Sequence, residues 1–154
     1  MISRYARALI ISVIIFFIDR FTKSLAYQTL QVTDFFICKG VSFSLTFNTG
    51  IAWSLFADAG WIVEGIIVIM TLYFLYQIGQ YAQERMQHGQ SIMGELLVIT
   101  GGLSNLCDRL LYPGVVDFIK IQGYGYTFPI FNIADVSVCI GIMVILRHHF
   151  LNTD

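Results

Sequence analysis

Four apolar stretches, each about 20 residues long, constrain what this chain can fold into. They cover residues 8–28, 61–81, 91–111 and 132–151. A helix rises about 1.5 Å per residue, so each stretch is long enough to cross the hydrocarbon core of a bilayer, about 30 Å thick. Only 12% of the residues are charged, about half the share in a soluble domain. The sequence therefore predicts a membrane all-α protein with four transmembrane helices, in one domain over residues 1–154.

The connections between these stretches predict the orientation. Arg4, Arg7, Arg85 and Arg147 flank the apolar stretches on one side, and basic residues favour the cytoplasm. Other basic residues lie at the opposite ends, so the orientation rests mainly on loop length: the short polar connection is inside, and the long ones are outside. We expect both termini to be cytoplasmic and the first stretch to be retained, because no small-residue cleavage pattern follows it.

The long connections contain strand-like sequence. Residues 41–48 alternate strictly between apolar and polar, which is typical of a half-buried strand. Residues 115–121 and 126–131 are predicted to be extended, and residues 51–57 to form a short helix at the membrane surface. Asn48 opens an N-T-G turn. We therefore expect a small extracytoplasmic β-sheet with a short surface helix.

Two aspartates at the outer boundary of apolar segments are the strongest functional candidates. Asp117 and Asp135 are separated by a connection of hairpin length, and ionisable residues are costly in a membrane. Two carboxylates close together in an apolar setting cannot both ionise easily, so one keeps a proton. The ionised one can take a proton from water while the other polarises a carbonyl. The sequence thus predicts acid–base hydrolysis of an amide without a metal or a covalent intermediate.

Each polar residue also has a purely structural interpretation. Asn132 and Asp135 have the spacing of a helix capping box, and Asp117 can be a loop residue at the surface. Asp19 either pairs with Lys23 one helical turn later or holds part of an active site. The residues alone leave these alternatives open.

A further group lies at the outer end of the third apolar stretch. Gly101 permits close helix approach, but packing does not explain Asn105, Asp108 and Arg109 near one another. Arg109 either extends to the headgroups or positions the site. We favour positioning, in which its planar fork braces the loop that carries Asp117 or holds carbonyl oxygens of the substrate.

Other chemistries lack their motifs in this sequence. H-E-x-x-H and G-x-S-x-G are absent, and the three histidines lie on the predicted cytoplasmic side. The three cysteines are isolated, and the net charge of −1 gives no reason to expect a nucleic-acid partner. We expect no metal and no cofactor.

Five motifs, in order, resemble the lipoprotein signal peptidases, also called type II signal peptidases. Any one of them is weak evidence, but together they extend over nearly the whole chain. They are D-R-F-T-K at 19–23, N-T-G-I-A-W-S at 48–54, G-G-L-S-N-L-C-D-R-L at 101–110, V-V-D-F-I at 115–119 and F-N-I-A-D at 131–135. Ser104 departs from the family, which usually has glycine there, but it removes no catalytic group.

The resemblance implies a function and a set of site residues. The family is a bacterial inner-membrane aspartyl endopeptidase that removes the signal peptide from diacylglyceryl-modified prolipoproteins, N-terminal to the lipidated cysteine. The chain would then be a monomeric integral-membrane peptidase domain in contact with membrane lipids, its active site toward the extracytoplasmic side. Asp117 and Asp135 would be catalytic. The supporting residues would be Asp19, Asn48, Gly101, Asn105, Asp108, Arg109 and Asn132.

Two rival functions use the same aspartates. A presenilin-like intramembrane aspartyl protease is disfavoured, because Asp117 lacks that family's G-x-G-D and Y-D patterns. A small proton-coupled transporter would use the aspartates as a proton relay. Incubation with a lipidated prolipoprotein separates these readings, since only a protease yields a shorter product.

Overall fold

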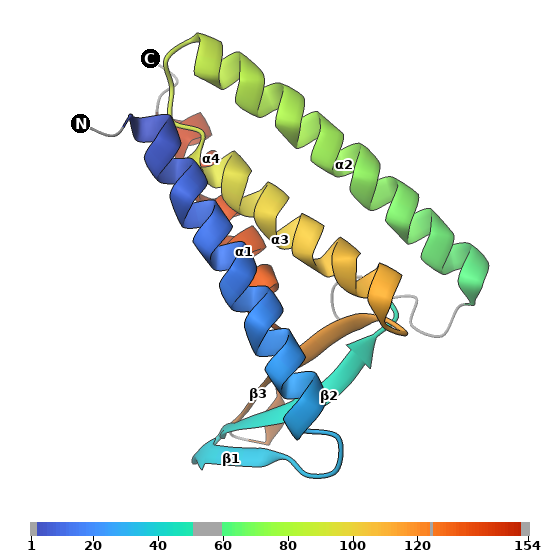
Figure 1. The fold of residues 1–154 in the computed structure, drawn as a ribbon. Helices are drawn as coiled ribbons and strands as arrows, with labels where there is room; N and C mark the ends of the chain where they lie inside the picture. Colours follow the sequence, from blue (N-terminus) through green and yellow to red (C-terminus); the bar gives the residue numbers. More distant parts are fainter. Residues whose placement is uncertain (1–2, 51–59, 124, 152–154) are drawn as a thin grey trace.

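The computed structural model describes residues 3–50, 60–123 and 125–151. Within these ranges the chain forms four long helices and one small antiparallel sheet (Figure 1). The helices are α1 (Arg4–Thr29), α2 (Trp61–Gln87), α3 (Met93–Leu111) and α4 (Ile133–Leu151). The strands are β1 (Phe35–Cys38), β2 (Val41–Asn48), β3 (Val115–Gly123) and β4 (Tyr126–Thr127). The predicted combination of helices with a small sheet is confirmed.

Each predicted apolar stretch is helical, but the helices differ in composition. Among the described residues, two helical segments are long and apolar enough to cross a membrane: Trp61–Gln87 and Ile133–Phe150. α1 and α3 instead carry the charged residues of the cluster described below. α2 extends past its predicted end, and the chain turns only at Gly89, whose φ of 68° suits glycine.

α3 lies between α1 and α2 in Figure 1 and packs against all three other helices. Its contact with α4 is close enough to require glycine. A Cβ added to Gly101 would lie 2.4 Å from the Ala134 carbonyl oxygen, and one added to Gly94 would lie 2.8 Å from that of Gly141. The expectation that small residues allow close helix approach is confirmed at Gly101. This approach brings the first turn of α4 against the polar end of α3.

The sheet lies at one end of the helices, and the start of α1 and the end of α4 lie at the other (Figure 1). β2 has the predicted bounds, and it pairs with β3 so that Thr46 faces Asp117. The predicted strand over 126–131 is shorter: β4 ends at Thr127, and Phe131 makes only an isolated bridge with Ile119. Pro129 interrupts it, because proline has no N–H to donate.

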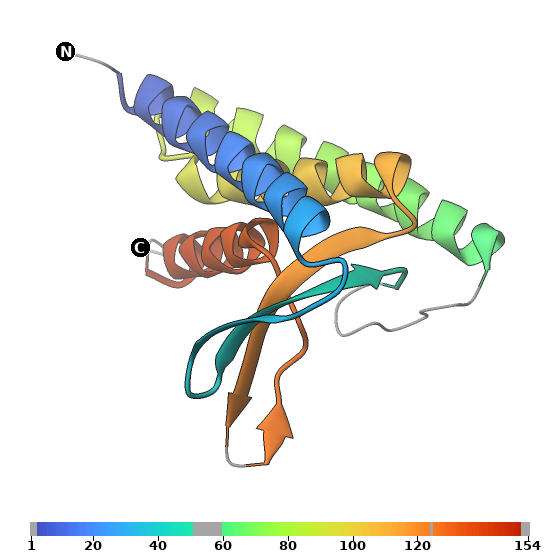
Figure 2. The same cartoon turned by 60° about the horizontal axis from the view of Figure 1, so that its bottom comes forward.

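The order of the sheet is β1-β2-β3-β4, with β1 at one edge. Figure 2 shows the strands projecting beyond the ends of α1 and α3. β3 follows α3 after only three residues, and α4 begins five residues after β4. The polar residues at the ends of these segments are therefore carried to one place. The predicted surface helix at 51–57 lies outside the described residues.

Candidate active site

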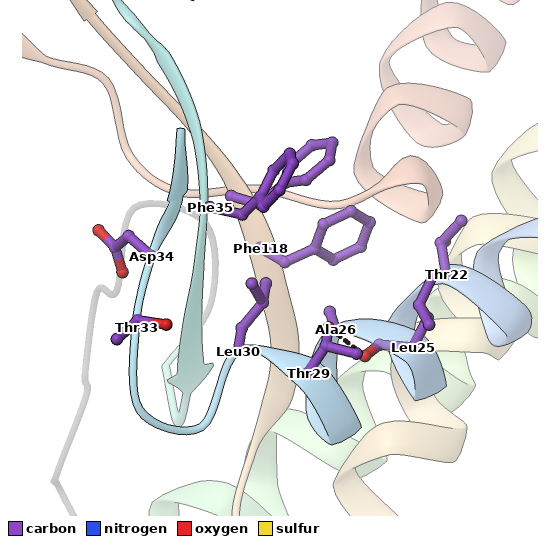
Figure 3. Close-up of a pocket in the computed structure, with 10 residues that line it drawn as sticks. Thr22, Leu25, Ala26, Thr29, Leu30, Thr33, Asp34, Phe35 and Phe118 are labelled. Carbon is purple, nitrogen blue, oxygen red and sulfur yellow. Dashed lines mark hydrogen bonds between the residues drawn. The ribbon is translucent and has the colours of Figure 1, made fainter. Parts of the chain in front are cut away.

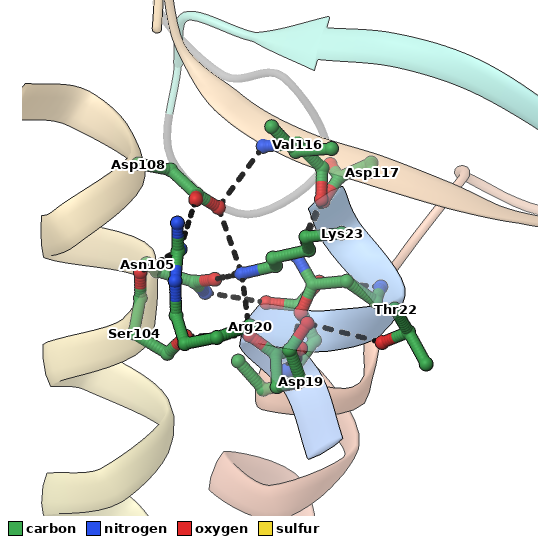
Figure 4. Close-up of polar contacts among 12 residues, drawn as sticks. Asp19, Arg20, Thr22, Lys23, Ser104, Asn105, Asp108, Val116 and Asp117 are labelled. Atoms are coloured by element: carbon green, nitrogen blue, oxygen red, sulfur yellow. Dashed lines mark hydrogen bonds and ion pairs between the residues drawn. The ribbon is translucent and has the colours of Figure 1, made fainter. Parts of the chain in front are cut away.

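Polar side chains from α1, α3, β3 and the start of α4 meet where the helices contact the sheet (Figure 4). Most are buried: Lys23, Asp108 and Asn132 have no exposed surface, Asp19 is 1% exposed and Asp117 3%. Burying charged groups is costly unless they are paired and hydrogen-bonded. These charged groups can therefore be buried here only if they form ion pairs and hydrogen bonds with one another.

Lys23 is at the centre of the cluster. Its Nζ lies 2.9 Å from Asp19 Oδ2 and 2.8 Å from Asp108 Oδ2, and it donates to Asn105 Oδ1 at 2.7 Å. These three acceptors match the three N–H donors of an ammonium group. Arg20 pairs with the other oxygen of Asp108. The predicted pair of Asp19 and Lys23 is therefore present, but it is buried among these partners and does not close the helix at a surface.

Lys23 and Arg20 are two site residues beyond those predicted from the sequence. Both lie in the far half of the first apolar stretch. A basic residue that cannot reach water from an apolar helix needs a carboxylate partner. That cost was the one available signal, because the partner Asp108 is more than 80 residues away in the sequence.

Asp19 connects three helices. Its Oδ1 accepts a hydrogen bond from the backbone N–H of Ala134 at 2.7 Å, in the first turn of α4. Its Oδ2 accepts from Ser104 Oγ at 2.5 Å. Ser104 is fully buried, so its hydroxyl supplies a contact from α3 that glycine at this position could not make.

Asn132 lies between the two candidate aspartates. Its Nδ2 donates to Asp117 Oδ1 at 2.6 Å, and its Oδ1 accepts from the Asp135 N–H at 2.9 Å. Asp135 Oδ2 in turn accepts from the Asn132 N–H at 3.1 Å. The predicted capping box is present. It does not compete with a functional role, because the same residue contacts both carboxylates.

The two aspartates have different surroundings. Burial raises the pKa of Asp117 to about 7, and the nearby negative charge of Asp135 adds to this increase. Hydrogen bonds from Asn132 and Asn48 oppose it. Asp135 Oδ1 accepts from Asn105 Nδ2 at 2.8 Å. Asp117 can therefore hold a proton near neutral pH.

The remaining predicted residues, Asn48 and Arg109, both contact Gly50 just after β2. Asn48 Oδ1 accepts from the Gly50 N–H at 3.0 Å, which is the predicted turn contact. Arg109 Nη2 donates to the Gly50 carbonyl oxygen. Arg109 thus holds the turn after β2. Its Nη1 is buried and has no hydrogen-bond partner among the described residues.

A cleft of about 390 Å³ reaches Asp117 from outside. It is lined by Thr46, Asn48, Asp117 and residues 127–130. The cleft has a size typical of ligand sites. It gives a substrate access to one of the two aspartates.

We expect the variant Lys23→Met to destabilise the fold strongly. It leaves Asp19 and Asp108 with less compensation in the buried cluster, which costs about 3–5 kcal/mol in free energy of unfolding. Thermal or denaturant unfolding in detergent measures this loss. Lys120→Met is the matched control, because the pair of Lys120 with Asp34 is partly exposed and contributes about 1 kcal/mol or less. Equal losses in the two variants would contradict a central role for Lys23.

The comparisons with known proteins agree on one family. A family model described as signal peptidase (SPase) II matches residues 11–151. Lipoprotein signal peptidases from Wigglesworthia glossinidia brevipalpis and Bacillus subtilis (strain 168) are each 31% identical, covering 89% and 93% of this chain and 90% and 92% of those relatives. A bacterial membrane enzyme solved by the in meso method at 1.9 Å is 27% identical with a TM-score of 0.78, covering 96% of this chain and 94% of that one. The chain therefore belongs to the signal peptidase II family.

Proposed function

We propose that this signal peptidase II hydrolyses its substrate with Asp117 and Asp135 as the catalytic pair. The observation that carries the proposal is the double contact of Asn132, which hydrogen-bonds both residues in one buried site. Asp117 carries the shared proton, since its pKa is raised to about 7. Asp135 accepts N–H groups of Asn105 and Asn132, an arrangement suited to a carboxylate. The family match does not favour the proton-coupled transporter.

The charge of the cluster supports a single shared proton. Two carboxylates and two cations balance in its ion pairs, so Asp117 and Asp135 add two negative charges that one shared proton reduces to one. A net charge in a buried site is costly. The paired carboxylates belong to Asp19 and Asp108, and the paired cations are Arg20 and Lys23.

The reaction then needs only water. Asp135 removes a proton from a water molecule, whose oxygen attacks the carbonyl carbon of the scissile peptide bond. Asp117 gives its proton to the carbonyl oxygen, forming a neutral tetrahedral intermediate. When the C–N bond breaks, Asp135 gives its proton to the leaving nitrogen. Asp117 recovers a proton from one of the two hydroxyl groups of the intermediate, which becomes a carboxylic acid. The pair returns to its starting state.

Arg109 can hold the substrate during these steps. Its Nη2 is occupied by the Gly50 carbonyl oxygen, while its buried Nη1 lacks a partner among the described residues. A buried donor without a partner is costly. A backbone carbonyl of the bound substrate would satisfy it and would align the peptide beside Asp117.

The burial of the charged side chains supports a proposal for the arrangement in the membrane. We propose that all four helices span a bacterial inner membrane as a monomeric domain over residues 1–154, with cytoplasmic termini and an extracytoplasmic sheet. α1 and α3 can span because the charged groups of their cluster face the interior: Asp19, Lys23 and Asp108 are at most 1% exposed. Apolar side chains of α1 instead face outward, with Phe17 65% and Phe21 69% exposed.

The proposed substrate is a prolipoprotein, as the relatives' name lipoprotein signal peptidase suggests. Its cysteine would carry a diacylglyceryl group, and cleavage would occur N-terminal to that cysteine. The signal helix would enter laterally from the bilayer. The lipid on the substrate would remain among the membrane lipids while the scissile bond reaches the cleft beside Asp117.

Asp117→Asn and Asp135→Asn are each expected to abolish cleavage, because an amide cannot replace a titrating acid. Gel analysis of a purified lipidated prolipoprotein measures the loss of the signal peptide. Glu84→Gln is the matched control, since Glu84 is exposed at the other end of the protein. If either aspartate variant still cleaves the substrate when equal amounts of folded protein are compared, the assignment of the catalytic pair is wrong.

The alkaline side of the pH profile should report the proton on Asp117. Since its pKa is raised to about 7, the proton is present below that pH and lost above it. We expect kcat/KM to fall about tenfold per pH unit on the alkaline side. Initial rates between pH 5 and pH 9, about two units on either side of this pKa, measure the profile. A rate that stays constant to the upper limit would contradict Asp117 as the acid.

Arg109→Lys tests the role of the guanidinium. Lysine keeps the charge but loses the planar guanidinium group. In arginine, Nη2 of this group binds Gly50 while Nη1 stays available for the substrate. We expect kcat/KM to fall at least about tenfold, equivalent to roughly 1.4 kcal/mol of transition-state stabilisation. An arginine that only reached the headgroups would tolerate lysine. Near-normal kinetics with an unchanged unfolding temperature would therefore support that simpler role.

A further inference from the structure

Ser104 directs its hydroxyl group away from its own helix. A serine inside a helix commonly hydrogen-bonds the backbone carbonyl four residues earlier. Ser104 Oγ of α3 instead donates to Asp19 Oδ2 of α1 at 2.5 Å (Figure 4). The side chain is fully buried, so bulk water cannot replace Asp19 as its partner. The hydroxyl is therefore committed to a residue 85 positions away in the sequence.

Asp19 connects this contact to the first turn of α4. Its Oδ1 accepts from the Ala134 N–H at 2.7 Å. This N–H is one of those that an α-helix leaves without a partner in its own first turn, and the helix dipole also favours a carboxylate at this end. The next residue is Asp135. The orientation of the Asp19 carboxylate therefore constrains the turn that carries Asp135.

α3 contacts Ala134 at its carbonyl group and, through Asp19, at its N–H group. The backbone at Gly101 lies so close to the Ala134 carbonyl oxygen that an added Cβ would be 2.4 Å from it. Ser104 lies about one turn further along the same side of α3 and reaches the Ala134 N–H through Asp19. The start of α4 is thus held at two points of one residue, first by close packing and second through the hydroxyl of Ser104.

Lys23 binds the same oxygen of Asp19, but it does not replace Ser104. Its Nζ lies 2.9 Å from Asp19 Oδ2 and also contacts Asp108 and Asn105. Lys23 is on the same helix as Asp19 and has a flexible four-carbon chain. Ser104 is on the helix that packs against α4, and only one rotatable bond separates its backbone from its hydroxyl oxygen. Lys23 therefore supplies the charge, whereas Ser104 determines how Asp19 is oriented relative to α4.

Ser104 lies outside both cavities described for this chain. The cleft beside the candidate pair is lined by Thr46, Asn48, Asp117 and residues 127–130. A second cavity, between the outer end of α1 and the sheet, is shown in Figure 3, and Ser104 does not line it either. Removal of the hydroxyl should therefore leave the surfaces of these cavities unchanged.

We propose that Ser104 is a positioning residue for the hydrolysis. Its hydroxyl orients the carboxylate of Asp19, which holds the first turn of α4 and so keeps Asp135 where it can take a proton from the attacking water. The inference rests on the proposed catalytic pair. A small displacement of a reacting group lowers the rate strongly, whereas the cleft that admits the substrate is unchanged. Loss of the hydroxyl therefore lowers kcat and leaves KM as it is.

The variant Ser104→Ala tests this role in the full chain in detergent. It removes the hydroxyl and leaves Asp19 with its other partners, so the chain should fold. We expect kcat for a lipidated prolipoprotein to fall at least about fivefold, with KM within about twofold of the wild-type value. Initial rates are compared at equal amounts of folded protein, and the unfolding temperature is measured for each variant.

Ser137→Ala is the matched control. Ser137 is also buried, with 4% of its surface exposed, and its Oγ donates from α4 to the Leu97 carbonyl oxygen of α3 at 2.9 Å. This variant also loses one buried hydrogen bond between helices, but the bond does not involve Asp19. We expect its kcat to stay within about twofold of the wild-type value.

Two further variants at the same position separate the hydroxyl from the volume of the side chain. Ser104→Thr restores a hydroxyl, and we expect its kcat per folded protein to be within about threefold of the wild-type value. Ser104→Gly lacks the hydroxyl and adds no bulk, so it should be as slow as Ser104→Ala. A threonine variant that folds but is as slow as the alanine variant would contradict the role of the hydroxyl.

Three other results would overturn the proposal. Normal kcat in Ser104→Ala, with only a lower unfolding temperature, would make Ser104 a purely structural residue. Equal losses of kcat in Ser104→Ala and Ser137→Ala would assign the effect to helix packing in general. A raised KM with unchanged kcat would assign Ser104 to substrate binding. Cleavage by Asp135→Asn would instead refute the catalytic pair, so the two failures are distinguishable.

Discussion

The buried ammonium group of Lys23 is the contact on which the rest of the site depends. It pairs with Asp19 and Asp108 and donates to Asn105, so it holds α1 against α3. Through Asp19 it also reaches α4, whose Ala134 N–H is bound by the other oxygen of the same carboxylate. Without a cation at this point, two carboxylates would be buried side by side at a large cost. The sheet and the helices therefore meet around one side chain.

The same ammonium group determines which way the neighbouring amide faces. An asparagine side chain has an acceptor end and a donor end. Lys23 occupies the Oδ1 of Asn105, so the Nδ2 of that residue is turned toward Asp135. Asn132 likewise uses its Oδ1 on the Asp135 N–H and turns its Nδ2 toward Asp117. Both candidate carboxylates thus face amide donors whose orientations are set by other contacts. In the proposed mechanism, the remaining variable is the location of the shared proton.

Local patterns made part of this structure predictable. Alternation defined the strand over 41–48, and spacing defined the capping box of Asn132 and Asp135, because both depend on neighbours within a few residues. The contacts of Lys23 with Asn105 and of Arg109 with Gly50 span 82 and 59 positions, and no local pattern carries them. The sequence therefore left open whether Arg109 extends to the headgroups. Pro129 was a local signal that β4 would be short, but the apolar run around it was interpreted as a longer strand.

The register of β3 determines that Asp117 lines the polar cleft while Phe118 packs beside Phe43. Asp117 and Phe118 are adjacent, and a slip of one residue would turn the carboxylate to the apolar face and the ring into the cleft. Two contacts oppose such a slip. Thr46 of β2 is paired with Asp117, and Asp108 Oδ2 accepts from the Val116 N–H at 3.2 Å. Because Lys23 binds that carboxylate, it also helps to fix which face of the strand each side chain occupies.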